Sequence, residues 1–236
     1  MLESSSNENT KHTKEAIEDI TNIIVYKWGM PKSSANALVE EIITQYLKEQ
    51  NMESNWLGES ELARFKSVGK NVLVSSKASL IGIEKISIGN DVRIDDFCTL
   101  NAANGFIEIG SNVHIGGYCY LGGGGGIIME DFSGISQGVR VYSASDDYSG
   151  KYMTNPTVPA EFTGVQSGTV TLEKHAIVGS NSVILPRVKI KEGTAIGAMS
   201  LIKKSCRPWS VYVGSPAQRI GPRDKGLLEL EKMYKQ

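Results

Sequence analysis

Histidine is the side chain best suited to act as a general base near neutral pH, because its unperturbed pKa is about 6.5. The sequence offers three, His12, His114 and His175. We expect no catalytic role for His12, which lies in a polar N-terminal tail. His175 follows Leu172 at a register that predicts a solvent-facing surface residue. His114 ends the six-residue unit IGSNVH, at a corner beside two glycines, and is the candidate base. A lone histidine at a corner is also commonly structural, so both interpretations stay open.

Two further groups of residues prove less informative. The three cysteines, Cys98, Cys119 and Cys206, cannot all pair and include no CxxC spacing, which excludes a disulfide scaffold. The run Gly122 to Gly126 has no following Lys-Ser or Lys-Thr, so it does not predict a phosphate-binding loop. We interpret this run as a widened corner of a repeat.

An internal repeat predicts the elements that position these residues. From Val68 to Ile202 an apolar residue recurs every six positions, in blocks of three. The eighteen positions are Val68, Val74, Leu80, Ile88, Ile94, Leu100, Ile109, Ile115, Leu121, Met129, Ile135, Val141, Leu172, Val178, Ile184, Ile190, Ile196 and Ile202. A small residue stands four positions after all of them except two, where Glu84 and Asn104 occur. Alternating strands of a sandwich would give a period of two, so a period of six predicts the triangular coils of a β-helix.

The spacing between blocks predicts where the chain leaves the coils. The early coils carry two or three extra residues after their third strand, and the step from 129 to 172 contains one coil plus 25 residues. We therefore predict a β-helix over residues 67–206 with an inserted loop at about 147–171. Residues 1–66 are predicted to form a polar tail and a helical segment, and residues 207–236 a tail and a helix. These helices would cap the solenoid, or the N-terminal ones would recognise a partner or acceptor.

Composition excludes several classes of protein. The 25 Lys and Arg residues balance 26 Asp and Glu residues, which argues against a nucleic acid as the main partner. No apolar run approaches the roughly 18 to 20 residues that span a bilayer, and the N-terminus lacks the apolar stretch of a signal peptide. These observations predict a cytoplasmic protein without a membrane span.

The repeat resembles the hexapeptide-repeat acyltransferases. The stretches IGSNVHIGGYCYLG and LEKHAIVGSNSVILPRVKIKEGTAIGAMSLIKKS, with the tail PWSVYVGSPAQRI, are similar to the sugar O-acetyltransferase branch, which includes the galactoside and maltose acetyltransferases. The similarity covers about residues 68–220. It implies a mainly β fold, a left-handed parallel β-helix of about six triangular coils with an N-terminal helical segment and a C-terminal helix. It also implies a homotrimer with three sites between subunits and acetyl-CoA as donor.

The resemblance also implies site residues. In the family, small residues of the last coils line the slot for the pantetheine arm, and these correspond to Gly179, Ser180, Gly197 and Ala198. Lys203 and Lys204 correspond to the basic step that meets the coenzyme phosphates, and the arginine of the tail motif falls at Gln218 or, one residue later, at Arg219.

The family's usual catalytic histidine is missing from its expected place, which Asp146 occupies in the unit VYSASD. We therefore consider His114 as the base, with Asp146 or Asp147 of a neighbouring chain orienting it or binding a sugar hydroxyl. A carboxylate base, Asp146 alone, and a non-catalytic cleft remain as alternatives. The polar and aromatic loop supplies acceptor candidates, which are Tyr142, Ser143, Asp147, Tyr148 and Tyr152.

From these residues we predict an acetyl-CoA-dependent O-acetyltransferase that acts on a sugar hydroxyl. Two alternatives are an N-acetyltransferase on a nucleotide-linked amino sugar and a non-enzymatic trimeric scaffold. The metal-dependent γ-type carbonic anhydrases, which share the repeat, need three histidines that converge on zinc. With one corner histidine, this chain is predicted to hold no metal.

Overall fold

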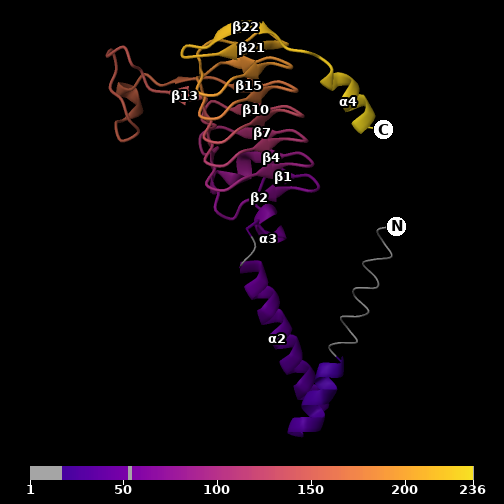
Figure 1. Ribbon diagram of the computed structural model, residues 1–236. Coiled ribbons are helices and arrows are strands. Elements are labelled where there is room, and N and C mark those ends of the chain that lie inside the picture. The colour runs from indigo at the N-terminus through magenta and orange to yellow at the C-terminus, as the bar shows by residue number, and fades with distance from the viewer. Residues whose placement is uncertain (1–17, 53–54, 236) are drawn as a thin grey trace. The chain divides into compact units, whose positions relative to one another are not determined.

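The computed structural model describes residues 18–52 and 55–235 (Figure 1). The chain divides into two compact units, Met1–Ser54 and Asn55–Gln236. Some of the sequence predictions fall outside the described residues. These are the polar N-terminal tail, the role of His12 and the last position of the predicted C-terminal segment. Within the described residues, no helix is both long enough and apolar enough to cross a membrane.

The first unit contains two helices. One is described over residues 18–28, and α2 spans Lys32–Met52. Gly29, with φ +64°, ends the first helix by donating its N–H to the Val25 carbonyl at 3.0 Å, a typical C-terminal cap. Ala35 and Val39 of α2 are buried.

The second unit is a solenoid of stacked coils (Figure 1). Its strands form three separate sheets, here called faces 1, 2 and 3, in which the strands of successive coils run parallel. Face 1 contains β1 (Ser67–Val68), β4 (Ile86–Ile88), β7 (Ile107–Ile109), β10 (Ile127–Met129), β15 (Val170–Leu172) and β18 (Lys189–Ile190). Face 2 contains β2 (Leu73–Val74), β5 (Arg93–Ile94), β8 (His114–Ile115), β11 (Gly134–Ile135), β16 (Ile177–Val178) and β19 (Ala195–Ile196), followed by β21 (Ser210–Val213) and β22 (Gln218–Pro222). Face 3 contains β3 (Ser79–Ile81), β6 (Thr99–Asn101), β9 (Tyr120–Gly122), β12 (Arg140–Tyr142), β17 (Val183–Ile184) and β20 (Leu201–Ile202).

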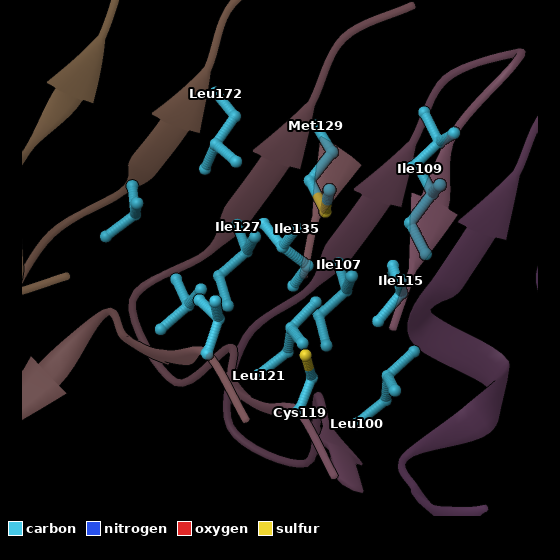
Figure 2. Packing of buried hydrophobic residues seen from close by; sticks show 14 of the residues in the cluster. Leu100, Ile107, Ile109, Ile115, Cys119, Leu121, Ile127, Met129, Ile135 and Leu172 are labelled. Carbon is cyan, nitrogen blue, oxygen red and sulfur yellow. The ribbon is translucent and has the colours of Figure 1, made fainter. Parts of the chain in front are cut away.

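The strand register confirms the predicted repeat. On face 1, Val68 pairs with Ile88, Ile88 with Ile109, and so on to Ile190, which places the recurring apolar residues directly above one another. All eighteen lie in strands, and all but the two at Val68 and Leu80 of the first coil are buried. Figure 2 shows these side chains converging inside the prism. Because each fully buried Leu or Ile stabilises the fold by roughly 1.5–3 kcal/mol, this stacked core holds the coils together.

The corners between faces are tight turns in left-handed backbone. The 1/2 corner, between faces 1 and 2, places Asn112, Phe132 and His175 at φ of +58°, +58° and +62°. The 2/3 corner places Phe97 and Tyr118 at φ +60° and +61°. Asparagine adopts this conformation readily, whereas bulky residues seldom do, so aromatic residues here are unusual.

The 3/1 corner is widened, as the spacing predicts. It contains the 3₁₀ turn Ile83–Lys85 and the glycine run, and the inserted loop leaves the solenoid there. The loop begins and ends with the antiparallel pair β13 (Ala144–Ser145) and β14 (Gln166–Ser167) and includes a 3₁₀ turn at Ala160–Phe162. In Figure 1 this loop and the C-terminal helix α4 (Leu227–Tyr234) lie on opposite sides of the solenoid.

Both ends of the solenoid are covered. Residues around α3 (Glu59–Leu62) lie on the first coil, where Trp56 bridges to Ser75 and the Leu57 N–H bonds the Val74 carbonyl at 2.8 Å. At the other end the antiparallel pair β21–β22 extends face 2. The protein is therefore mainly β, a β-helix with flanking helices, which confirms the predicted fold class.

Candidate active site

His114 lies on the outer surface of face 2. It begins β8, and because Ile115 points into the core, the preceding imidazole points outward. Its Nε2 lies 2.8 Å from Oδ2 of Asp95, one coil earlier, and 54% of the histidine side chain is exposed. Since Nε2 is the nitrogen held by the carboxylate, Nδ1 is the nitrogen that can accept a proton from a substrate.

Asp95 is the partner that sequence reasoning missed. Arg93 Nε donates to its second oxygen, Oδ1, at 2.6 Å, so both carboxylate oxygens are engaged. Burial by itself would raise the pKa of Asp95, but the hydrogen bonds and charges of Arg93 and His114 outweigh it and lower the pKa. The carboxylate therefore remains ionised and favours an imidazole oriented as a base. The repeat spacing could have predicted this contact. It places Arg93, two residues before Asp95, directly opposite His114 on the neighbouring coil.

His175 is not the surface residue that its register predicted. Only 7% of it is exposed, because α4 covers the 1/2 corner where it lies. Its Nε2 is 2.8 Å from Oε2 of Glu231 on α4, and its ring stacks on Phe132 with centroids 5.3 Å apart. Arg223 also donates to the His175 carbonyl at 2.8 Å. This histidine therefore fastens the C-terminal helix to the solenoid.

A hollow of about 400 Å³ lies between α4 and the solenoid and connects the two histidines. Leu227, Leu230 and Ile177 form apolar parts of its wall, while His114, His175 and Glu231 supply polar groups. The candidate base therefore borders a concave space.

The acceptor candidates lie at and beyond the end of β12. Tyr142 packs against Tyr120 with ring centroids 5.4 Å apart, and Tyr148 and Tyr152 are exposed. Ser143 is fully buried, donating its hydroxyl to the Gly122 carbonyl at 2.5 Å and accepting the Gly125 N–H at 2.8 Å. Ser143 thus shapes the widened corner in this chain.

The two loop aspartates form local hydrogen bonds. Oδ2 of Asp146 accepts the Asn155 N–H at 3.3 Å. Oδ2 of Asp147 accepts both the N–H and the hydroxyl of Ser149, at 3.1 and 2.7 Å. The Asp147 bonds shape the turn that follows it, the Asp146 bond joins two parts of the loop nine residues apart, and none of these contacts involves His114.

Two of the coenzyme candidates lie together in a second hollow. Lys203 and Lys204 line a space of about 420 Å³ with Tyr212, Pro216 and Gln218. Both lysines are exposed, so their ammonium groups are available to an anionic ligand. Arg219 points elsewhere in this chain, since its Nε donates to the Ser210 hydroxyl at 3.0 Å.

The small residues of the last coils lie outside that hollow, along face 2. A side chain at Gly179 would come within 2.5 Å of the Ala198 backbone nitrogen, and one at Gly197 within 2.7 Å of Val213. Both glycines are therefore required by close packing of successive coils. Ser180 and Ala198 follow them with small side chains, whereas Met199, directly after Ala198, is 70% exposed. Among the described residues, no group of three or more His, Cys, Asp or Glu side chains is placed to hold a metal ion.

Comparisons with known proteins identify the family. No protein-family model matches the sequence. The dTDP-4-amino-4,6-dideoxy-D-glucose acyltransferase of Escherichia coli is 50% identical over 171 residues, which cover 72% of this chain and 89% of that enzyme. The chain belongs to the hexapeptide-repeat acyltransferase family. AntD, an N-acyltransferase from Bacillus cereus solved in complex with dTDP and 3-hydroxybutyryl-CoA, has the same left-handed β-helix, with 46% identity and a TM-score of 0.73 over 77% of this chain and 97% of that one.

These findings correct the predicted reaction. The expectation of O-acetylation at a sugar hydroxyl is wrong, because both relatives are named for N-acylation or for an amino sugar on dTDP. The coil motifs and the tail that carried the resemblance reflect the repeat itself. One fold supports several chemistries, so these motifs do not predict which acceptor an enzyme takes.

Proposed function

We propose that this protein is an acyl-CoA-dependent N-acyltransferase that acts on the amino group of a dideoxyamino sugar linked to dTDP. The main support is the 50% identity to the dTDP-4-amino-4,6-dideoxy-D-glucose acyltransferase over most of both chains. A further structure of AntD, in complex with dTDP-4-amino-4,6-dideoxyglucose and coenzyme A, covers 78% of this chain and 98% of that one. The chain therefore contains nearly the whole length of an enzyme of that class.

In this proposal His114 acts as the base and Asp95 as the residue that positions it. The sugar amine attacks the thioester carbonyl, the new amide C–N bond forms, and the C–S bond breaks. The proton lost from the nitrogen passes to Nδ1 of His114 and then to the departing thiolate, so coenzyme A leaves as the thiol. Asp95, ionised and held by Arg93, stabilises the imidazolium that forms between these two transfers.

We propose that the donor binds with its phosphates at Lys203 and Lys204. Its pantetheine arm would then run along the strip of small residues on face 2. Two exposed ammonium groups beside a hollow of about 420 Å³ suit a phosphorylated coenzyme. Ser180 and Ala198 carry only small side chains, which would leave room on the surface for an extended pantetheine arm. The donor is acetyl-CoA or a longer acyl-CoA, and the assay below distinguishes them.

We also propose that the enzyme works as a homotrimer. Asp146 and Asp147 lie in the loop that leaves the 3/1 corner, whereas His114 lies on face 2, and their recorded hydrogen bonds are local to the loop. This separation favours a meeting of the loop with the imidazole across a subunit boundary. Asp146 of the partner subunit would then contact the amino sugar.

A direct assay tests the proposed reaction. Thiol release from acetyl-CoA and from 3-hydroxybutyryl-CoA is measured with dTDP-4-amino-4,6-dideoxy-D-glucose, maltose or a galactoside as acceptor, and products are identified by mass spectrometry. We expect turnover with the amino sugar nucleotide and an N-acyl product. Turnover confined to maltose or the galactoside would contradict the proposal.

A further inference from the structure

The 2/3 corner carries a pair of stacked aromatic rings that the reaction described above does not use. Phe97 and Tyr118 occupy the same corner position in successive coils, with ring centroids 5.0 Å apart and planes at 30°. They are 49% and 61% exposed. Both lie in left-handed backbone, a conformation that disfavours bulky side chains. The chain thus holds two large apolar rings in solvent at a conformational cost.

The 1/2 corner shows what the same chain does with an aromatic pair that is purely structural. There Phe132 and His175 occupy equivalent positions in successive coils and stack with centroids 5.3 Å apart. This pair is covered by α4, whose Tyr234 packs edge-on against Phe132 with centroids 6.0 Å apart. Among the described residues, the pair at the 2/3 corner has no helix over it. Its exposed face is therefore suited to a ligand.

The backbone beneath the exposed rings is firmly held. The Tyr118 N–H bonds the Asp96 carbonyl at 3.0 Å, and the Tyr118 carbonyl accepts Nη1 of Arg140 at 2.5 Å. On the far side, Lys77 Nζ lies 5.7 Å from the centre of the Phe97 ring and is paired with Asp96 at 2.8 Å. A rigid, pre-oriented ring loses little entropy when a flat ligand stacks on it.

The exposed pair also lies next to the proposed catalytic dyad. Asp95, whose Oδ2 contacts His114, directly follows β5 of face 2 and lies two residues before Phe97. A ligand that spans this face would reach the imidazole at one end and the rings at the other. A nucleotide sugar has this bipartite chemistry, with a reactive sugar nitrogen at one end and a flat heteroaromatic base at the other.

We infer that Tyr118, backed by Phe97, forms the platform on which the pyrimidine base of the nucleotide-sugar acceptor stacks, on the ring face turned away from Phe97, while the sugar nitrogen lies at His114. This inference rests on the proposed function, because it assumes a nucleotide-linked acceptor. Stacking of a base on an aromatic side chain is tolerant of base identity, so the rings supply affinity, and discrimination between pyrimidines comes from other groups.

Direct binding measurements test the platform. Affinity for dTDP and for inorganic pyrophosphate is measured by calorimetry in the wild type and in Phe97→Ala, Tyr118→Ala and Tyr118→Phe. We expect the two alanine variants to bind dTDP roughly tenfold more weakly, with pyrophosphate binding unchanged and Tyr118→Phe close to the wild type. Tyr26→Ala, which removes an exposed ring from the first unit, is the matched control and should bind dTDP normally. Light scattering of every variant records its oligomeric state.

The outcomes separate this inference from the proposed function. If the wild type binds dTDP and transfers the acyl group, but the alanine variants bind dTDP equally well, the platform is wrong and the function stands. If the wild type neither binds dTDP nor acylates the amino sugar, the function fails and the platform fails with it. If Phe97→Ala or Tyr118→Ala changes the number of subunits, the rings are a subunit contact, and the inference is overturned.

Discussion

His114, on face 2, and His175, at the 1/2 corner two coils later, have the same first partner, a carboxylate oxygen 2.8 Å from Nε2. Their surroundings differ. Asp95 beside His114 has one further cation, Arg93, and the imidazole is half-exposed. Glu231 beside His175 receives two lysines as well, and both side chains are almost fully covered. A histidine–carboxylate pair therefore does not by itself indicate catalysis, because access for a substrate distinguishes the two.

The two histidine–carboxylate pairs are assembled from different parts of the chain. His114 and Asp95 are both contributed by the coils, so their arrangement is fixed by strand register alone. His175 is closed off by α4, which arrives 56 residues later along the chain. If this difference determines their roles, substitution at His114 should affect the reaction, whereas substitution at His175 should affect the stability of the fold.

The largest effect is expected for His114→Ala. Removing a general base that takes part in the transition state typically costs about 10²–10⁴ in rate, so we expect kcat for acylation of the amino sugar to fall by that factor. The exposed imidazole buries little surface, so the melting temperature should stay close to that of the wild type. Steady-state kinetics with acyl-CoA in excess, together with thermal unfolding, measure both quantities.

The matched control is His175→Ala. We expect this variant to unfold at a lower temperature, because it leaves the buried Glu231 with one partner fewer and opens space beneath α4. Its kcat, measured well below the unfolding transition, should remain near that of the wild type. Full activity of His114→Ala would remove the base from the proposed mechanism and leave the acyltransferase family unchanged.

A smaller loss is expected for Asp95→Asn, which keeps the shape of the side chain and removes its charge. We expect kcat to fall roughly tenfold, less than for His114→Ala, because Asp95 acts through the imidazole and does not touch the substrate. The charge of Asp95 balances the positive charge that forms on the imidazole during proton transfer, so kcat should fall in the variant while the KM for the amino sugar stays near that of the wild type. An unchanged kcat would show that the carboxylate only fills space.

The coils could be predicted from the sequence because their signal is local. Each strand needs one inward apolar residue and each corner one small residue, and Ile94, Ile115 and Ile135 follow this rule at the same position of three successive coils. The strand register then follows from the spacing. Figure 2 shows part of the result, a cluster of apolar side chains from successive coils that gather inside the solenoid.

The candidate site was harder to predict because its contacts join separate coils and elements. Asp95 meets His114 across 19 residues, and the burial of His175 depends on a helix whose docking no coil motif describes. The acceptor was predicted wrongly for a related reason. The motifs that carried the resemblance specify the solenoid, and one fold can serve an acceptor nucleophile that is oxygen or nitrogen.

The smallest effect is expected for Glu231→Gln, which tests the buried side of the comparison. Hydrogen bonds from Lys174 and Lys235, together with the bond to His175, lower the pKa of Glu231 from its usual 4.5 to about 2, against the opposing effect of burial. A carboxyl group with a depressed pKa in the folded state stabilises the fold above the unfolded value and loses this contribution as the pH falls through the folded value. The stabilisation by Glu231 should therefore be complete above about pH 4.5 and disappear toward about pH 2.

The difference in melting temperature between the wild type and Glu231→Gln measures this contribution, because all other titrating groups are common to both. We expect the wild type to be more stable by a few degrees at neutral pH and the gap to close between about pH 4.5 and 2. Glu229→Gln, on the exposed face of the same helix and paired only with Lys232, is the control and should show no such gap. A gap that is constant with pH would mean that the glutamine disturbs packing, and that α4 is held over His175 by Leu227, Leu230 and Tyr234 instead of by charge.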